Sequence, residues 1–385
     1  MAKHLSERTS FDICLLEQEY DLAAHQSGRN SGVLHPGLAL SLKPGTRKAE
    51  FAIKGSRRLR AYCRERNLPI RDTGLLLVAT SEAETEQLYD VHDRISGLNI
   101  DLEWLDEADI EDREPNVSGE MALYTSDSST VETQPITYEL ANDARRDGVE
   151  FYMGTEVESV TRHGDTIRLD TDKGPFEVDY LINAAGTAAV HLAHDLGIAK
   201  EFSSVPFRGQ YYELVPKRRT LINTNVYPVS MPPRVPNQVG VHFTRRPDNK
   251  VIVGPTGMIA LGLDTYGTRE FDLWEIRRTV SAANFWRFIG STDTLRIAWR
   301  ELNKTYRKEV FLEHCRKLVP NLGEHDISRS FVGISHYVLD SSGNIGDASR
   351  FAKGPRSTHI LRPKPGLTSS LSIGDYIAGL VEDRY

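Results

Sequence analysis

The sequence predicts an α/β protein in which a mostly parallel sheet is interleaved with a second domain of α+β type, built on an antiparallel sheet. Three segments carry this prediction. Residues 11–16 form an apolar run that stops at Glu17, as in a buried strand of a parallel sheet. Residues 151–186 divide into short strands separated by turns, and residues 205–262 contain longer strands of antiparallel type.

The segment around Glu17 favours a nucleotide site. In a Rossmann-like fold, an acid at the end of the second strand accepts hydrogen bonds from the adenosine ribose. The loop that follows reads HQSGRNSG, in which glycines let a ligand approach the backbone while Gln26, Ser27, Asn30 and Ser31 offer polar groups. Two plainer interpretations stay open, because a strand-ending Glu is often only solvated and such a loop is often only a turn.

The glycine-rich turn of a Rossmann-like fold normally lies about 20 residues before that acid. Counting back from Glu17 places the turn before Met1, and residues 2–8 are typical of the last two turns of the helix that follows it. We therefore expect Met1 to be a misassigned start or a truncation boundary. A chain without the first strand and its glycines could fail to hold a cofactor.

The bulk composition excludes several classes of protein. A net charge of −7 argues against a general nucleic-acid binder, which needs an excess of Lys and Arg. The three cysteines, Cys14, Cys63 and Cys315, are far apart and form no C-x-x-C, which indicates a reduced, cytoplasmic setting without a structural metal. No apolar run approaches the roughly 18 residues of a membrane span, and no signal peptide is visible.

The first half of the chain alternates helices with strands. Residues 49–67 have apolar side chains at helical spacing and a basic opposite face, which favours a solvated helix over a nucleic-acid or membrane site. Residues 74–80 form the apolar strand GLLLVAT, and residues 82–95 form a charged helix. The shorter segments of this half are a turn at 108–115, a strand at 122–125, a loop at 126–133 and a helix at 136–147.

The second half begins with the meander at 151–186, whose last strand ends in Ala-Ala-Gly. Gly186 would let the backbone pass close to a ligand. The antiparallel strands at 205–262 precede two helical segments with an apolar face. These are residues 270–290 and 294–318, with Trp274, Ile276, Phe285, Trp286 and Phe288 as the predicted core. The chain ends with a strand at 359–361, a Pro/Gly loop at 363–368 and a helix at 369–381.

The motif HQSGRNSGVLHPG resembles the signature H-Q-[ST]-G-x-N-S-G-V-[IL]-H-x-G of flavin-dependent L-2-hydroxyglutarate oxidases and dehydrogenases. This family is part of a larger group of flavoproteins that resemble D-amino-acid oxidase. The likeness continues in PFRGQYYEL, GVHFT, VGPT and PKPGLTSSLSIG, which occur in the family's order. The resemblance implies an FAD-binding domain interleaved with an antiparallel substrate domain.

The resemblance also implies where the cofactor and the domains lie. Val157 would offer main-chain groups to the adenine, and the N-terminus of the last helix would face the flavin, where its positive dipole end stabilises the reduced ring. The residues expected to bind FAD are Glu17, Gln26, Ser27, Asn30, Ser31, Gly32, Val157, Ala185, Gly186, Gly366, Leu367, Thr368 and Ser369. The expected FAD-binding domain comprises 1–80, 131–204 and 326–385, and the substrate domain comprises 81–130 and 205–325.

Oxidation of a 2-hydroxy acid needs a base for the hydroxyl proton and a cation for the carboxylate. Histidine exchanges protons near neutrality, and the arginine fork matches a carboxylate. The resemblance assigns these roles to His242 and Arg208, with His35 as a second histidine beside the flavin. His242 is the preferred base, although a histidine in a strand is often only structural.

Several positions depart from the family pattern. Ala39 and Leu40 replace two tyrosines, and Met231 replaces an acid. Ser335 stands where the family has a carboxylate-binding arginine, whereas Lys364 replaces a serine in the flavin-side loop, where it is expected to restore a positive charge. Loss of a bidentate charged contact costs about 1.5–3 kcal/mol. These departures put the substrate in question more than the cofactor.

The leading hypothesis is therefore an FAD-dependent oxidoreductase that converts L-2-hydroxyglutarate to 2-oxoglutarate and passes electrons to oxygen or a quinone. A quinone acceptor leaves open a peripheral contact with the inner face of the membrane. Two alternatives stay open. One is a sister enzyme that acts on an amino acid or another small polar acid, and the other is a truncated, non-catalytic chain.

Overall fold

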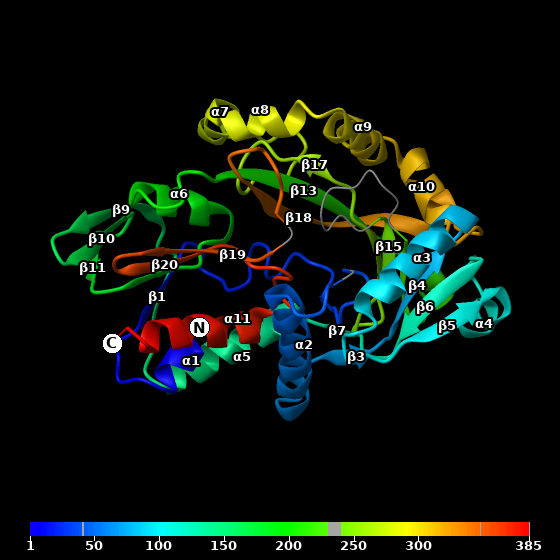
Figure 1. Ribbon diagram of the computed structural model, residues 1–385, viewed down its shortest axis with the longest axis horizontal. Helices are drawn as coiled ribbons and strands as arrows, with labels where there is room; N and C mark the ends of the chain where they lie inside the picture. The colour runs from blue at the N-terminus through cyan, green and yellow to red at the C-terminus, as the bar shows by residue number, and fades with distance from the viewer. Residues whose placement is uncertain (41, 230–239, 347, 385) are drawn as a thin grey trace.

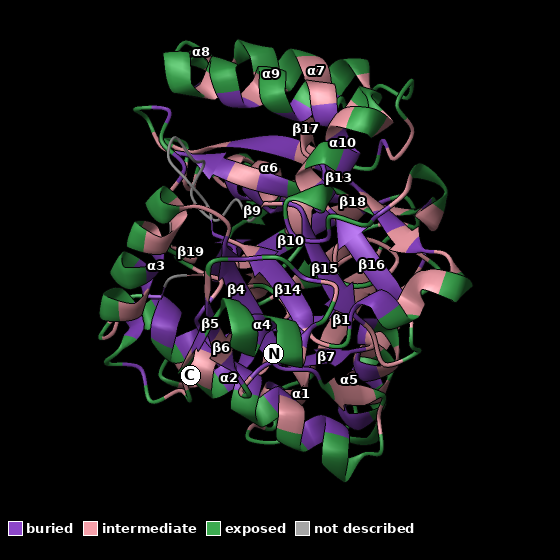
Figure 2. Cartoon of the chain, turned by 90° about the vertical axis from the view of Figure 1, so that its right-hand side faces the viewer, coloured by how far each residue is buried: buried purple, intermediate pink, exposed green. Residues whose placement is uncertain are grey.

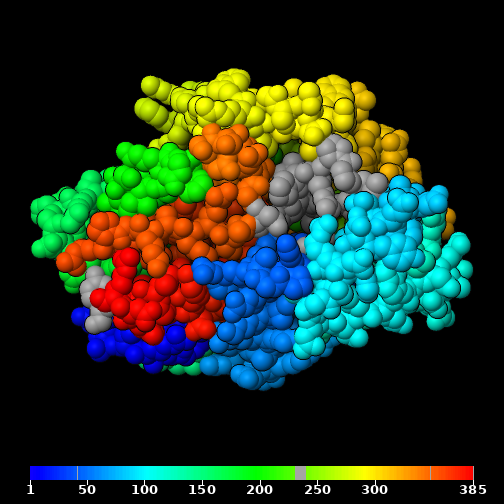
Figure 3. Space-filling view, in the orientation of Figure 1, coloured from blue at the N-terminus to red at the C-terminus, as the bar shows by residue number. Residues whose placement is uncertain are grey.

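The computed structural model describes residues 1–384 apart from 41, 230–239 and 347. It has a nine-stranded sheet on one side and several smaller sheets on the other, with four helices arched over both (Figure 1). The N-terminal and C-terminal segments lie side by side on the same face of the molecule (Figures 1 and 3). Met231, one of the departures from the family pattern, falls outside the described residues.

The predicted parallel strands are present, but they lie in two separate small sheets. Strand β1 (Cys14–Glu17) pairs in parallel with β8 (Glu150–Met153). Strand β12 (Leu181–Asn183) pairs in parallel with β20 (Ser357–Arg362), which also pairs with antiparallel β19 (Arg350–Gly354). The mixed α/β class is thus confirmed.

The meander predicted at 151–186 is smaller than expected. Its antiparallel strands are β9 (Val157–His163), β10 (Thr166–Thr171) and β11 (Phe176–Val178). The preceding strand, β8, is the parallel partner of β1 instead. Strand β8 is too short for its apolar pattern to show whether it pairs with β1 or with β9.

The largest sheet contains the strands predicted at 205–262 together with others from both halves of the chain. Its order is β17-β13-β16-β15-β14-β4-β6-β5, with β18 paired along the opposite edge of β13 from Ser203 to Leu214. The bounds are β4 (Leu75–Ala79), β5 (Glu103–Asp106), β6 (Met121–Thr125), β13 (Ser203–Leu214), β14 (Asn225–Pro228), β15 (His242–Arg245), β16 (Val251–Gly254), β17 (Met258–Ile259) and β18 (Ile327–Leu339).

Strand β4 shows where the predicted boundary at residue 80 departs from the observed pairing. All five of its residues are buried, and it lies between β14 and β6 in the nine-stranded sheet. The predicted boundary follows this strand and groups it with residues 1–80, whereas its pairing joins it to the sheet that contains the strands of 205–262. An apolar strand reveals its burial but not its neighbours. The division into two functional domains stays a prediction.

Helices surround these sheets, and several begin at a side-chain cap. Thr46 accepts a hydrogen bond from the backbone of Ala49 at the start of α2, and Ser81 does so from Glu84 at the start of α3. The helix bounds are α1 (Ala2–Ser6), α2 (Arg47–Glu65), α3 (Glu82–Ile95), α4 (Glu107–Arg113), α5 (Thr133–Arg146), α6 (Ala189–Asp195), α7 (Leu273–Ser281), α8 (Ala283–Ile289), α9 (Thr292–Tyr306), α10 (Lys308–Arg316) and α11 (Ser370–Glu382).

Two short elements differ from the sequence prediction. The turn predicted at 108–115 contains α4, because Asp106 and Asp109 form a capping box that begins a helix. The loop predicted at 126–133 contains the strand β7 (Ser129–Val131). It joins β2 (Val33–Leu34) and β3 (Ile70–Asp72) in a small sheet, and its Ser-Thr-Val sequence gives no apolar alternation by which to find it.

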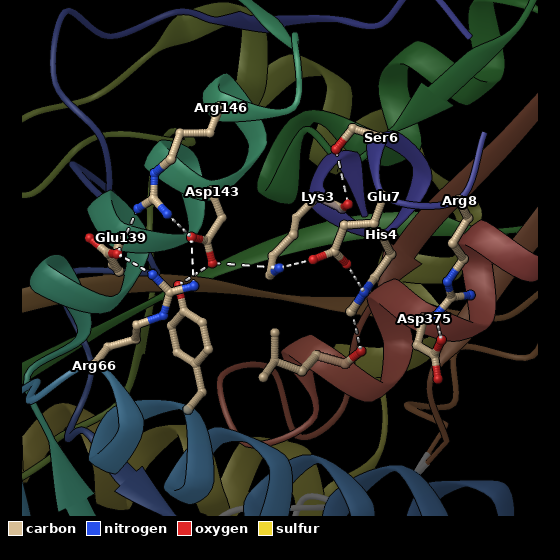
Figure 4. A network of polar contacts seen from close by, with 12 residues as sticks. Lys3, His4, Ser6, Glu7, Arg8, Arg66, Glu139, Asp143, Arg146 and Asp375 are labelled. Atoms are coloured by element: carbon tan, nitrogen blue, oxygen red, sulfur yellow. Dashed lines mark hydrogen bonds and ion pairs between the residues drawn. The ribbon is translucent and has the colours of Figure 1, made fainter. Parts of the chain in front are cut away.

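Helix α1 is fixed by ion pairs to α5 and α11 (Figure 4). Asp143 of α5 is buried and accepts a hydrogen bond from the hydroxyl of Tyr62 at 2.8 Å. The same carboxylate lies 3.0 Å from Arg66 and 3.5 Å from Lys3 of α1. Burial raises the pKa of Asp143, but the hydrogen bond from Tyr62 and the charges of Lys3 and Arg66 outweigh this effect, so the pKa lies below its usual value. The network joins the first residues of the chain to its middle.

The basic face of α2 is neutralised by neighbouring acids. Arg58 pairs with Asp375 at 2.6 Å, and Arg64 pairs with Asp72 at 2.7 Å. Arg66 pairs with Glu139 and Asp143. The sequence favoured a solvated face over a nucleic-acid or membrane site, and these ion pairs account for most of its positive charge.

The predicted core of the helical segment 270–290 is only partly buried. Phe285 and Phe288 are buried, as predicted. Trp274 of α7 and Trp286 of α8, however, are 74% and 57% exposed. Figure 2 shows exposed residues along both helices. Helical spacing therefore identified an apolar face, but the helices turn part of it away from the protein.

Burial keeps several histidines neutral. It lowers the pKa of His242, His336 and His359 to about 4. The unfolded chain takes up these protons below its ordinary histidine pKa of about 6.5, whereas the folded chain does not. Folding stability therefore declines as pH falls through this window and is constant for these groups above about pH 7.

We predict that the free energy of unfolding decreases steadily between pH 6.5 and 5, by up to about 1.4 kcal/mol per pH unit for each such histidine. Denaturant titrations at several pH values measure this slope. His359 is fully buried. The variant His359→Gln should lower the slope of unfolding free energy against pH by the contribution of one histidine. An unchanged slope in this variant would contradict the assignment.

Candidate active site

A cavity of about 990 Å³ lies between the small sheets, the nine-stranded sheet and helices α8, α9 and α11. Its walls come from segments far apart in the chain. They include the loop 26–35, the turn at Gly186, strands β13 and β18, and the loop 363–371. Such a concave, largely apolar space with a few polar groups is the usual form of a cofactor or substrate site.

The loop HQSGRNSG lies beside the Ala-Ala-Gly turn. Gln26, Ser27, Asn30 and Ser31 line the cavity, as does Gly186. A Cβ atom at Gly186 would lie 3.5 Å from the amide nitrogen of Gln26, so the two segments are close neighbours. Gly186 has φ +58°, a conformation that favours glycine. The two segments that sequence analysis assigned to one ligand therefore meet at one wall.

Asn30 has a structural role in this loop. Its amide nitrogen donates to the carbonyls of Gln26 at 2.9 Å and Ser27 at 2.7 Å, and its oxygen accepts from the backbone of Gly32 at 2.8 Å. Gly32 has φ +74°. The side chain thus holds the loop in a turn, which leaves Gln26 and Ser27 as the polar side chains directed at the cavity.

The start of α11 forms another wall. Gly366, Leu367, Thr368 and Ser370 line the cavity. Ser369 is fully buried, and its hydroxyl has no hydrogen-bond partner among the described residues. The helix has no side-chain cap, so the backbone N–H groups of its first turn remain for a ligand or solvent.

Helix α11 reaches this position because it packs closely on α2. A Cβ atom at Gly55 of α2 would lie 2.2 Å from the carbonyl oxygen of Thr368 and 2.7 Å from Cα of Ser369. Only glycine allows this approach. Thr368 also accepts a hydrogen bond from the backbone of His35 at 3.1 Å, which ties the loop to the opposite wall.

Arg208 provides a buried cation on the wall formed by β13. It is 5% exposed, and its Nε donates to the carbonyl of Tyr266 at 2.6 Å. Burial lowers the pKa of Arg208 from its usual value, but the guanidinium stays charged at neutral pH. Ser335 and Tyr337 of β18 line the cavity on the neighbouring strand.

Tyr266 is a residue that sequence analysis missed. Its hydroxyl is 2.6 Å from Nδ1 of His25, whose Nε2 is 2.8 Å from Glu19. Arg29 stacks on the Tyr266 ring at 4.2 Å. The HQSGRNSG loop therefore holds the segment that positions Arg208. The composition of the 263–270 loop gives no local signal for this contact, which depends on tertiary structure.

The two histidines proposed from sequence lie at different distances from the cavity. His35 lines the cavity, whereas His242 is buried behind it. The ring of Tyr227 separates them, stacked on His242 at 4.0 Å and edge-on to His35 at 6.0 Å. Burial lowers the pKa of His35 to about 3 and that of His242 to about 4, so both rings are neutral at pH 7.

The hydrogen bonds of these histidines also differ. Nδ1 of His242 lies 2.9 Å from the carbonyl of Gly240. Nδ1 of His35 and Nε2 of His242 have no partner among the described residues. The sequence preferred His242 as the base, and of the two histidines only His35 lines the cavity. The assignment of the base stays a prediction.

Lys364 lies behind the wall formed by Tyr337. It is buried, and its ammonium group is 5.9 Å from the centre of the Tyr337 ring. Arg362 lies over the same ring at 4.4 Å. Ser335 is two residues before Tyr337 in β18, so it points to the same side of the strand. The positive charges of Lys364 and Arg362 thus lie against the ring of Tyr337, on the same strand as Ser335.

Other predicted site residues lie around the cavity without forming its wall. The predicted site residues that do not line the cavity are Glu17, Gly32, Val157, Ala185, His242, Lys364 and Ser369. Glu17 ends β1, and one of its carboxylate oxygens accepts from the backbone of Glu19 at 3.0 Å. Val157 begins β9. No cluster of three or more His, Cys, Asp or Glu suited to a metal occurs among the described residues.

Comparison with known proteins identifies this arrangement. The family model "DAO: FAD dependent oxidoreductase" matches residues 1–380. The chain belongs to this family. FAD is therefore its cofactor. The family match covers both the small sheets and the nine-stranded sheet, so the cavity between them lies within the shared region.

Relatives of this FAD-dependent oxidoreductase include L-2-hydroxyglutarate dehydrogenases. The protein of Escherichia coli O17:K52:H18 is 31% identical over 96% of this chain and 87% of its own length. The mitochondrial protein of Caenorhabditis elegans is 29% identical over 99% of this chain and 89% of its own length. The resemblance stated from the HQSGRNSG motif is confirmed at the level of the family.

Solved structures share the fold. L-α-glycerophosphate oxidase from Mycoplasma pneumoniae with FAD bound has a TM-score of 0.73 and 21% identity, covering 97% of this chain and 89% of that one. Glycine oxidase from Geobacillus kaustophilus has a TM-score of 0.69 and 18% identity, covering 99% of this chain and 90% of that one.

The cavity fits FAD in chemistry as well as in size. Gly186 and the loop at Gln26 provide close backbone approach on one side. On the other side, Gly366, Leu367 and Thr368 line the cavity before α11, and the first turn of that helix, which has no side-chain cap, offers backbone donors. A helix N-terminus stabilises negative charge, which a flavin ring acquires on reduction.

We predict that Gly55→Ala destabilises the protein by about 1–3 kcal/mol, because the new methyl group overlaps the 368–369 backbone. FAD retention should fall as the start of α11 moves. Thermal unfolding and the ratio of flavin to protein absorbance measure both effects. Gly379→Ala is the matched control, since a Cβ atom there meets nothing within 4 Å. Equal behaviour of the two variants would contradict the prediction.

Proposed function

We propose that this FAD-dependent oxidoreductase oxidises an L-2-hydroxy acid, with L-2-hydroxyglutarate as the substrate and 2-oxoglutarate as the product. The single observation that carries the proposal is that the buried guanidinium of Arg208 and the neutral imidazole of His35 line the same cavity. The similarity to L-2-hydroxyglutarate dehydrogenases supports the choice of substrate.

In this proposal, the guanidinium of Arg208 binds the carboxylate next to the reacting carbon. Because Tyr266 already occupies Nε, the terminal nitrogens are directed at the substrate. The unpartnered Nδ1 of His35 accepts the hydroxyl proton, for which a neutral imidazole is required. The chemistry that FAD supplies when bound is acceptance of the hydride from C2.

Tyr227 and His242 have a supporting role in this proposal. The stacked pair fills the space behind His35 and keeps water from its rear side. A proton on His35 would be disfavoured by burial, and the substrate carboxylate offsets this by bringing a negative charge into the cavity. The base therefore becomes effective when substrate is bound.

Lys364 and Arg362 are proposed to attract the second carboxylate of a dicarboxylic substrate. Both cations are buried against Tyr337, whose ring borders the cavity. Ser335 leaves room at the wall that an arginine would fill. The positive charge is thereby supplied from β20 and the loop after it, in place of β18.

Electron transfer and location complete the proposal. Oxygen or a quinone accepts the electrons, and the protein acts in the cytoplasm, with a peripheral contact at the inner membrane face if the acceptor is a quinone. Among the described residues, no helix combines the length and the apolar character needed to cross a membrane.

A second candidate is oxidation of an amino acid or another small polar acid. Ser335, Ala39 and Leu40 favour it, because they remove groups that the L-2-hydroxyglutarate family uses. A third is a chain that does not retain FAD. The deciding experiment is anaerobic reduction of the purified flavoprotein by a panel of hydroxy and amino acids, followed at the flavin absorbance.

Rapid bleaching by L-2-hydroxyglutarate supports the proposal. Bleaching by amino acids alone supports the second candidate. A preparation that is colourless and does not take up added FAD supports the third.

We predict that His35→Asn lowers kcat by about 10²–10⁴-fold, the usual contribution of a positioned base. His242→Asn should lower it by less than about tenfold, since that ring only supports His35. Steady-state kinetics with L-2-hydroxyglutarate measure both. The opposite order would restore His242 as the base.

We predict that Lys364→Ser raises KM for L-2-hydroxyglutarate by about ten- to a hundredfold, the effect of losing a charged contact. The same change should have little effect on a monocarboxylic hydroxy acid. Adding Ser335→Arg in the Lys364→Ser background should restore part of the affinity. Failure of the second substitution to restore affinity, with the fold intact by circular dichroism, would exclude this role of the charge.

A further inference from the structure

Helices α7–α9 expose an unusual number of large apolar side chains. Fifteen such side chains are exposed among the described residues, and nine of them lie between 271 and 306. Seven of these nine are 57–74% exposed, namely Phe271, which precedes α7, and Leu273, Trp274, Trp286, Leu295, Trp299 and Tyr306. Three of the four tryptophans of the chain belong to this set. We call the surface that they form the outer face of α7–α9 (Figure 2).

The helices cannot bury this face by rotating inward, because their other side already has a function. Phe288, Ile289 and Ile297 line the active-site cavity from α8 and α9. Phe285 and Phe288 pack with Val205 and Leu339 of the nine-stranded sheet. The helices are therefore apolar on two sides, and the outer side has no partner among the described residues. Figure 3 shows them along one edge of the molecule.

The charges on the same helices are positive. Five arginines of α7–α9 are exposed, namely Arg277, Arg278, Arg287, Arg296 and Arg300, against one exposed carboxylate, Asp293. The whole chain carries a net charge of −7, so this surface opposes the overall sign. Glu275 and Glu301, the other acids of these helices, are buried.

This basic surface differs from that of α2. The arginines of α2 form close ion pairs with Asp72, Glu139, Asp143 and Asp375, as described above. On the outer face, Arg278 forms a close pair with the buried Glu275 at 2.9 Å, whereas the pairs Arg296–Asp293 and Arg300–Glu301 are longer, at 3.9 and 3.7 Å. Arg277 lies over the ring of Trp274 at 5.7 Å. Cationic and aromatic groups are thus adjacent on the surface.

Tryptophan, leucine and arginine on one exposed helical face are the combination that binds the interface of a lipid bilayer. The apolar side chains enter the headgroup region, the tryptophans lie at its boundary, and the cations contact anionic lipids. A second copy of the chain is a less suitable partner, because a symmetric contact would bring five arginines of each face together.

We propose that the outer face of α7–α9 docks on the surface of an anionic lipid bilayer. The contact is peripheral, and it places the wall of the active-site cavity that α8 and α9 form next to the membrane. The proposal specifies the surface and the lipid charge for the peripheral contact considered above. It does not depend on the substrate, because vesicle binding is measured without catalysis.

The test is co-sedimentation of the purified protein with vesicles of phosphatidylcholine alone or mixed with phosphatidylglycerol. We expect binding to the mixed vesicles, weaker binding at high salt, and a blue shift of tryptophan fluorescence on binding. Trp274→Glu with Trp299→Glu should abolish binding. Arg277→Gln with Arg296→Gln should weaken it by about tenfold or more, as each basic residue near an anionic surface contributes about fivefold.

Two matched controls change the same residue types elsewhere. Arg57→Gln with Arg64→Gln removes two exposed arginines of α2, and Tyr89→Glu changes an exposed aromatic residue of α3. Both should bind like the unchanged protein. Thermal unfolding establishes that each variant is folded.

Three results would overturn the proposal. The first is equal binding to neutral and anionic vesicles, and the second is unchanged binding of the folded tryptophan variant. The third is a dimer in solution, without vesicle binding, that the tryptophan substitutions dissociate. That result would assign the outer face to contacts between copies of the chain.

Discussion

The contact between α2 and α11 at Gly55 is the constraint on which the site depends. It brings the last helix of the chain against an early one, with less than a methyl group of space between them. The start of α11 then faces the cavity, and Thr368 joins it to the backbone of His35. Without this close packing, the start of α11 and the backbone of His35 would not be held in a fixed position relative to each other.

Burial of the titratable groups around the cavity determines their protonation states. Burial keeps His35 and His242 neutral, which suits a base, while Arg208 stays charged because its intrinsic pKa is far above neutrality. The cavity wall thus carries a charged guanidinium and a neutral imidazole, and charges interact more strongly in such a desolvated space than in water. The same burial makes the fold sensitive to acid.

Helices α7–α9 link this chemistry to the outside of the molecule. Their inner side forms part of the cavity wall, and their outer side carries exposed tryptophans and arginines. A cluster of large apolar side chains on an exposed surface commonly marks an interaction site. An interaction at this face would therefore act directly on the wall that encloses the substrate.

The sequence by itself determined the mixed α/β class, most helices and strands, the family and the cofactor. Local signals carry these features: apolar strands, capped helices, and the HQSGRNSG loop with its two glycines. It also singled out Arg208 and His35, since both lie in motifs that the family shares.

Only the tertiary structure decided which sheet receives β4, which histidine borders the cavity, and which contacts hold Arg208. It also showed that Trp274 and Trp286 face outward and that the arginines of α2 are paired. The physical reason is common to all of these cases. Periodicity specifies that a side chain lies on an apolar or a polar face, but the neighbour that covers that face comes from a distant part of the chain.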